Sequence, residues 1–177
     1  MNATGERVLV AYGTKHGATR AIAQAIGKTL SAAGIEVDVQ PARRVGSIER
    51  YRAVVLGSAV YARRWRADAL RLLRRSELGE RDVWLFSSGP VGESKGDPEQ
   101  FERMTRPPRV QQIAADIGAR EHVVFGGMVA EDAGFIRKQM ARRIPPELRD
   151  LRDWDAIETW SKAIGATLTE RPVPARA

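Results

Sequence analysis

The sequence predicts an α/β protein built on a doubly wound, five-stranded parallel sheet with helices on both faces. Short runs rich in Val, Leu and Ile alternate along the chain with longer stretches of helical periodicity, as in βαβ units. The first run, Arg7–Tyr12, is apolar almost throughout, which is typical of a strand covered on both faces. Right-handed crossovers would then place helices on both sides of the sheet.

Five runs have the length and composition of strands. The second alternates in polarity, which predicts a half-exposed edge strand. In chain order the runs are Arg7–Tyr12, Ile35–Gln40, Ala53–Ser58, Asp82–Ser88 and His122–Val129.

Helices are predicted after Gly13 up to Gly34, over Ala67–Arg75, over Val110–Ile117, and from an Asp cap at Asp153 to Leu168. Helical spacing assigns inner faces to three of them. These are Ala21, Ile22, Ala25, Ile26, Thr29 and Leu30 in the first, Ala69, Leu70, Leu72 and Leu73 in the second, and Trp154, Ile157, Trp160, Ile164 and Leu168 in the last.

The 177 residues fit one domain, expected over 1–169, with an insertion at 130–153 and a disordered tail at 170–177. The chain has no cysteine, which excludes disulfides, thiolate metal sites and iron–sulfur ligation. No apolar run approaches the ~20 residues that span a bilayer, so we expect a soluble, cytoplasmic protein. With two histidines and no cysteine, we expect no metal site.

Positive charge is in excess, since 29 Lys and Arg face 22 Asp and Glu, a net charge of +7. Such a field attracts anionic proteins, substrates or surfaces. General use of arginine by the source genome would explain it equally well. Because the arginines are dispersed and no nucleic-acid-reading motif is present, we do not expect nucleic acid as a partner.

The loop after the first predicted strand is the first candidate for a ligand site. Ligands of open parallel sheets bind beyond the carboxyl ends of the strands, and hydroxyl groups, glycine and a helix N-terminus suit a phosphate. The loop is neither G-x-G-x-x-G nor a P-loop. The alternative is a polar turn in which Thr14 or Thr19 caps the helix. Its candidate residues are Thr14, Lys15, His16, Gly17, Ala18 and Thr19.

Two further loops follow the third and fourth predicted strands. Tyr61 in the second could stack on a planar heterocycle, whereas we expect Trp65 to pack under the helix that follows. The third is rich in Gly and Ser, which leaves room for a flat ring. The candidate residues are Ser58, Ala59, Val60 and Tyr61 in the second loop, and Ser88, Gly89, Pro90, Val91 and Gly92 in the third.

At these loops the chain resembles the flavodoxin superfamily, and more closely the flavodoxin-domain proteins that include bacterial quinone-dependent protoporphyrinogen oxidases. Four motifs carry the resemblance: GTKHGAT from Gly13, VVLGSAVY from Val54, FSSGPVG from Phe86 and DWDAIETWSKAI from Asp153. The resemblance implies a flavodoxin-like strand order, 2-1-3-4-5, and FMN as cofactor. It places the FMN phosphate in the first loop and the isoalloxazine between the other two, with no side chain as catalytic acid or base.

The resemblance further implies a redox function, with electrons passing from an anionic substrate through FMN to a quinone. The alternative is a non-catalytic electron carrier that docks on another redox protein. The oxidase-like relatives carry an insertion where this chain has residues 130–153, which read as a basic amphipathic helix. Such a helix could contact the inner face of a membrane, or it could simply cover the core.

Overall fold

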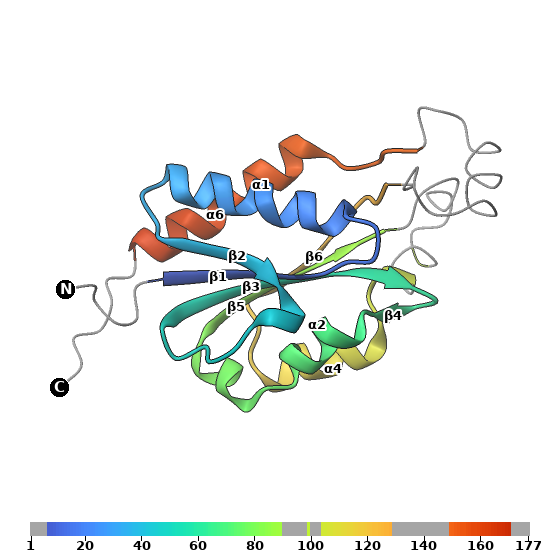
Figure 1. Ribbon diagram of the computed structural model, residues 1–177, viewed down its shortest axis with the longest axis horizontal. Coiled ribbons are helices and arrows are strands. Elements are labelled where there is room, and N and C mark those ends of the chain that lie inside the picture. Colours follow the sequence, from blue (N-terminus) through green and yellow to red (C-terminus); the bar gives the residue numbers. More distant parts are fainter. Residues whose placement is uncertain (1–6, 90–98, 100–103, 129–148, 171–177) are drawn as a thin grey trace.

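The computed structural model describes residues 7–89, 99, 104–128 and 149–170 (Figure 1). The described elements form an α/β fold with a parallel sheet between helices. In chain order they are β1 (Arg7–Gly13), α1 (Ala18–Ala32), β2 (Val37–Pro41), the 3₁₀ turn η1 (Ala42–Arg44), β3 (Tyr51–Tyr61), β4 (Arg64–Trp65), α2 (Ala67–Leu73), the 3₁₀ turn η2 (Ser76–Glu80), β5 (Asp82–Ser88), α4 (Pro108–Asp116), β6 (Glu121–Phe125) and α6 (Trp154–Glu170).

The five parallel strands run in the order β2-β1-β3-β5-β6, which confirms the predicted order 2-1-3-4-5. A sixth strand, the two-residue β4, was not predicted. It pairs antiparallel with the end of β3, outside the parallel path. The third predicted strand is therefore longer than expected and ends at Tyr61 instead of Ser58.

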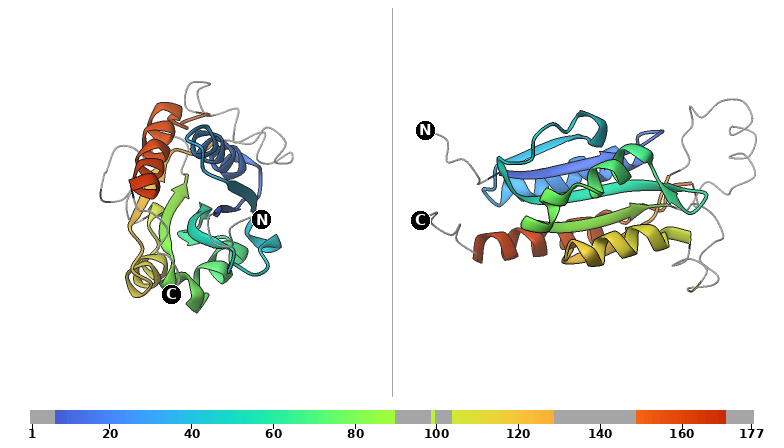
Figure 2. Two further views of the ribbon diagram at one scale, coloured as in Figure 1. Left: turned by 90° about the vertical axis from the view of Figure 1, so that its left-hand side faces the viewer. Right: turned by 90° about the horizontal axis from the view of Figure 1, so that it is seen from below.

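Helices α1 and α6 cover one face of the sheet, and α2 and α4 cover the other (Figure 2). Because side chains alternate along a strand, β1 contributes side chains to the hydrophobic cores on both faces of the sheet. Val8 and Val10 pack on the α1 and α6 side, and Leu9 and Ala11 pack on the α2 and α4 side. This explains why the first strand is apolar at successive positions. β2, by contrast, is half-buried, as predicted for an edge strand.

A glycine in the middle of β3 makes room for the aromatic part of the α1 and α6 core. A Cβ on Gly57 would overlap the ring of Phe86 on β5. That ring packs edge-on against Trp160 at 6.2 Å and lies 6.1 Å from Phe125. Packing of this cluster thus requires glycine at position 57.

The predicted inner face of the last helix is right in its middle and wrong at its start. Ile157, Trp160, Ile164 and Leu168 are buried, whereas Trp154 is 43% exposed. The Arg152 guanidinium lies 4.7 Å from the centre of the Trp154 ring, which therefore contacts a cation instead of the core.

The other differences are at element ends and on helix faces. In α1 Ala23 and Gly27 are buried, whereas the predicted Ala21, Ala25 and Thr29 are only half-buried, because the helix packs closely on β2 at Gly27. β6 ends at Phe125, short of the predicted Val129, because the chain at Leu151 packs onto Gly126. Pro90, Val91, Gly92, most of the 130–153 insertion and the tail beyond residue 170 lie outside the described residues.

Candidate functional site

The three candidate loops begin side by side at the carboxyl edge of the sheet. Gly13 of β1 is paired in register with Ser58 of β3, and Ala59 of β3 with Ser88 of β5. In Figure 1 this edge lies at the right, where the strand arrows point. The parallel pairing therefore brings together strand ends that are 29 to 75 residues apart in sequence.

The first loop is a tight turn that leads into α1. The Gly17 N–H donates to Thr14 Oγ1 at 3.0 Å, and Gly17 has a φ of 89°, a left-handed conformation that favours glycine. Thr14 therefore stabilises the turn, but the predicted alternative of a cap by Thr14 or Thr19 is wrong, because the N-cap of α1 is Gly17 and no side chain caps it. The first N–H groups of α1 have no acceptor within the helix and give this end a partial positive charge.

Thr19, in the first turn of α1, is the unusual residue of this loop. It is fully buried, and its Oγ1 has no hydrogen-bond partner among the residues that the structure describes. A buried, unsatisfied hydroxyl costs about 1–3 kcal/mol. A phosphate oxygen at the helix N-terminus would supply the missing acceptor, so this loop fits a phosphate group.

The second loop is a two-residue β-hairpin between β3 and β4. Val60 pairs with Trp65 and Tyr61 with Arg64, while Ala62 and Arg63 have φ values of 47° and 59°. Positive φ at both central residues is the signature of a type I′ turn. The ring of Tyr61 lies 6.5 Å from the ring of His16, edge to face, so the hairpin meets the first loop.

Trp65 is buried, as predicted, in the cluster on the α2 and α4 side. Its Nε1 donates to Ser87 Oγ at 2.9 Å, and His122 Nε2 lies 2.9 Å from the same oxygen. The indole and imidazole rings meet edge to face at 5.7 Å. This polar chain ties the hairpin to β5 and β6, and sequence reasoning did not find it.

His122 is held neutral in this cluster. Burial is the main cause, and the positive charge of Arg106 adds to it; together they lower the pKa of His122 from 6.5 to about 4. Because an indole N–H can only donate, Ser87 Oγ accepts from Trp65, and its own proton is available to a neutral imidazole.

The third loop begins at Gly89, which has a φ of 127°. Its N–H donates to the carbonyl of Phe125 at 3.1 Å. A Cβ at this position would lie 3.6 Å from the carbonyl oxygen of Val60, so the second and third loops come close at Gly89. The structure thus brings together the described members of all three predicted groups, while Pro90, Val91 and Gly92 lie outside the described residues.

The model of the flavodoxin domain family matches residues 9–151, a stretch that contains all three loops. The chain belongs to the flavodoxin domain family. Membership implies FMN as the cofactor, and the partnerless hydroxyl of Thr19 at the helix N-terminus fits its phosphate. A comparison with curated protein sequences gives no significant match.

Solved flavodoxins share the fold of this family member. An archaeal flavodoxin is 13% identical, with a TM-score of 0.60, over 92% of this chain and 99% of its own. Flavodoxin 2 from Bacillus cereus is 18% identical, with a TM-score of 0.58, over 93% of this chain and 98% of its own. The flavodoxin of Streptococcus pneumoniae is 14% identical, with a TM-score of 0.61, over 91% and 99%.

The described residues contain no group of three or more His, Asp or Glu placed to hold a metal ion. None of the helices in the described part of the chain is long and apolar enough to cross a membrane.

Proposed function

We propose that this flavodoxin-domain protein binds FMN at the three loops and uses it to transfer electrons. The observation that carries the proposal is the buried, partnerless hydroxyl of Thr19 at the start of α1, beside two loops that pairing in the sheet brings alongside. FMN supplies the redox chemistry when it is bound, and the protein supplies binding and orientation. We propose that residues 1–169 act as one unit in this role.

In this proposal the first loop binds the phosphate. The Thr19 hydroxyl and the first N–H groups of α1 donate to its oxygens, and Lys15 adds a positive charge. Gly17 provides the turn that aims these donors. The residues proposed to bind the phosphate are Thr14, Lys15, His16, Gly17, Ala18 and Thr19.

The other two loops hold the ring in the same proposal. The half-buried Tyr61 offers an aromatic face, and Gly89 leaves one side of the gap without a side chain. The Trp65–Ser87–His122 chain keeps the hairpin at a fixed position beside β5. The ring-lining residues proposed are Ser58, Ala59, Val60 and Tyr61, together with Ser88, Gly89, Pro90, Val91 and Gly92.

The direct test is the absorbance spectrum of freshly purified protein, followed by titration of the cofactor-free chain with FMN. We expect flavin bands, release of FMN rather than FAD on heating, and tight rebinding of FMN. A colourless preparation without affinity for FMN would overturn the proposal.

A second candidate is an oxidoreductase of the protoporphyrinogen oxidase type, with a quinone as electron acceptor. The observation that favours it is a set of cationic side chains without carboxylate partners near the loops, which would suit a carboxylated substrate. The assay supplies protoporphyrinogen and a menaquinone analogue to the FMN-loaded protein. Failure to oxidise the first or reduce the second would eliminate this candidate and leave the electron carrier.

A further inference from the structure

Five cationic side chains surround the first two loops, and we call this set the basic rim. Four of the five are exposed, and the fifth, Arg66, is half-buried. The members come from the first loop, the first turn of α1, the hairpin and the residue before α2. They are Lys15, Arg20, Arg63, Arg64 and Arg66.

Short distances place the rim at the proposed FMN site. If Gly13 carried a Cβ, that atom would lie 3.0 Å from the Cβ of Arg66. A Cβ on Gly17 would lie 3.7 Å from Nη2 of Arg20. Arg64 pairs with Tyr61 across the hairpin, and Arg63 is in the turn at its tip. The rim therefore extends from the phosphate loop along the hairpin that carries the proposed stacking ring.

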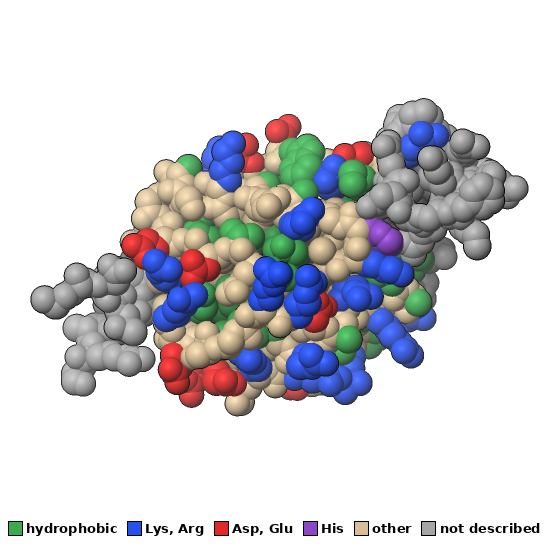
Figure 3. Space-filling model, viewed as in Figure 1, with side chains coloured by type: hydrophobic (Ala, Val, Ile, Leu, Met, Phe, Trp, Pro, Cys, Tyr) green, Lys and Arg blue, Asp and Glu red, His purple; other side chains and the backbone are tan. Residues whose placement is uncertain are grey.

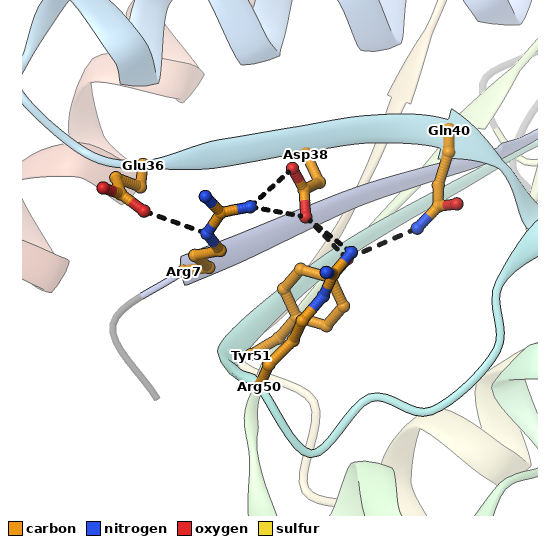
Figure 4. Close-up of polar contacts among 6 residues, drawn as sticks. All are labelled: Arg7, Glu36, Asp38, Gln40, Arg50 and Tyr51. Carbon is orange, nitrogen blue, oxygen red and sulfur yellow. Dashed lines mark hydrogen bonds and ion pairs between the residues drawn. The ribbon is translucent and has the colours of Figure 1, made fainter. Parts of the chain in front are cut away.

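At the opposite edge of the sheet, arginines are paired with carboxylates. Arg7 contacts Glu36 at 2.9 Å and Asp38 at 3.2 Å, and Arg50 contacts Asp38 at 3.0 Å (Figure 4). Arg120 likewise contacts Asp82 at 2.7 Å. The chain thus supplies acids to its arginines at the amino ends of the strands.

The basic rim has no such partners. Within the described part of the chain, no rim side chain forms an ion pair with a carboxylate. Asp68 is close to the first loop, but its Oδ1 accepts from the Ala69 N–H and lies 3.1 Å from the Cβ position of Gly13. In Figure 3 Lys and Arg side chains gather over the centre and right of the view, while acidic groups lie at its left end and along its upper edge. Exposed arginines elsewhere, such as Arg43, Arg44 and Arg71, also form no ion pair among the described residues, so the rim is distinguished by its place around the first two loops.

We propose that the basic rim is the docking surface for an acidic redox protein that exchanges electrons with the bound FMN. This inference rests on the proposed function. The FMN phosphate carries at most two negative charges and would lie nearest Lys15 and Arg20, which leaves Arg63, Arg64 and Arg66 for the partner. Complementary charge at an interface speeds association and selects the partner.

The form of the rim favours a protein surface over a membrane. Arg63 is at the tip of a hairpin that projects from the sheet, so the charge is presented outward. Among the described residues, the exposed large hydrophobic side chains are Val39 and Trp154, and neither belongs to the rim. A membrane-binding surface would combine basic charge with exposed apolar side chains.

The test uses an acidic plant-type [2Fe–2S] ferredoxin as the probe, with one electron passing from the reduced cluster to the flavin of the holoprotein. Stopped-flow rates are compared for the wild type, for Arg63→Glu/Arg64→Glu, and for the control Lys28→Glu/Arg74→Glu. The control makes the same charge change at exposed positions near the far ends of α1 and α2. We expect the rim variant to be slower by about tenfold or more at low salt, and the control to be slower by less than about threefold.

Salt provides a second readout. With ferredoxin the wild-type rate should fall as salt rises, whereas reduction of a basic c-type cytochrome by the reduced holoprotein should become faster. The docking proposal would be overturned if the rim and control variants lost the same factor in electron-transfer rate, or if the rate with ferredoxin did not depend on salt. Binding of the wild type to anionic phosphatidylglycerol vesicles that is lost in the rim variant, without ferredoxin binding, would reassign the rim to a membrane.

The two proposals can fail separately. Neither Arg63 nor Arg64 belongs to the proposed FMN site, so all three proteins should bind FMN within about twofold of one another. Calorimetric binding of oxidised ferredoxin to the FMN-free chain measures docking without electron transfer. If the wild type does not bind FMN, the proposed function is overturned. If it binds FMN but not ferredoxin, only the docking surface is overturned.

Discussion

At Thr19 a single side chain is expected to affect both the stability of the fold and the binding of the proposed ligand. Its buried hydroxyl has no partner among the described residues, so it contributes no hydrogen bond to the cofactor-free fold. In the proposed function its partner is a phosphate oxygen of FMN. Its position in the first turn of a helix suits an anionic group.

We therefore predict that Thr19→Val has opposite effects on the two properties. The free energy of unfolding of the FMN-free protein should stay unchanged or rise, because an unsatisfied hydroxyl is removed and the shape is kept. The dissociation constant of FMN should rise about 10- to 100-fold, the value of a hydrogen bond to a charged group. Chemical denaturation and fluorescence titration measure the two.

Thr29→Val is the matched control, because it makes the same change at a half-buried position near the other end of α1. It should leave FMN affinity unchanged. Equal effects of the two substitutions on FMN binding would contradict a phosphate-binding role for Thr19.

His122 makes the stability of the protein depend on pH. In the folded state its pKa is about 4, and on unfolding it returns to 6.5. Between these values the unfolded chain binds a proton that the folded chain does not, so acid favours unfolding. The free energy of unfolding therefore has its full value, as far as His122 is concerned, above pH 6.5. It falls by roughly 3 kcal/mol as the pH decreases from 6.5 toward 4.

Urea denaturation of the wild type should therefore show stability falling between pH 6.5 and 4. His122→Gln removes the titrating group and should flatten this part of the profile. His16→Gln changes the other histidine of the chain and should keep the slope. A slope that survives in the His122 variant would assign the pH dependence to other groups.

At the scale of elements, the β3–β4 hairpin combines local strain with tertiary support. Ala62 and Arg63 both adopt left-handed conformations, which cost a non-glycine residue about 1–2 kcal/mol. The Trp65 indole, hydrogen-bonded to Ser87, is placed to hold the hairpin in this shape. Strain of this kind is typical of functional sites.

Ala62→Asn should relieve part of the strain, since asparagine tolerates positive φ, and should stabilise the protein by about 0.5–1 kcal/mol. Ala62→Val should destabilise it, because a β-branched residue fits this conformation poorly. The two midpoints of urea denaturation are compared with the wild type. If both variants shifted the midpoint in the same direction, the turn would not have the type I′ conformation.

The same hairpin shows where sequence reasoning ended. Strand positions and their order followed from apolar runs and from the family resemblance, but the turn was missed because Ala-Arg lacks the Asn-Gly or Gly signal of such hairpins. Trp154 has the helical spacing of the buried Ile157 and Trp160, yet at the first residue of α6 it is 43% exposed and lies against Arg152 instead of the core. Periodicity gives the face of a helix, and only tertiary structure shows how far along that face the core reaches.

The convergence of the three candidate loops was predictable for the same reason that the sheet was. Each loop follows a predicted strand, and parallel pairing alone brings the three loops to one edge. The Ser87–His122 contact was not predictable, because 35 residues separate the pair and only the pairing of β5 with β6 makes them neighbours. The gathering of the rim cations around two loops was hidden for the same reason, since composition gives only the net charge.

At the scale of the whole molecule, the proposed ligand site is an edge of the sheet built from three separate segments. The proposed ligand contacts β1, β3 and β5 through their loops, so binding it should stabilise the folded state as a unit. For FMN at 100 times its dissociation constant, the expected gain in the free energy of unfolding is about 2.7 kcal/mol.

Riboflavin separates the contribution of the phosphate from that of the ring. It offers the same ring to Tyr61 and Gly89 but nothing to the Thr19 hydroxyl or the start of α1. At the same concentration we expect it to raise the free energy of unfolding by less than about 1 kcal/mol, because the charge-assisted hydrogen bonds are absent. Thermal denaturation with each ligand, repeated with Thr19→Val, measures this difference. Equal stabilisation by riboflavin and FMN would place the binding energy in the ring alone and would leave the buried hydroxyl without a ligand.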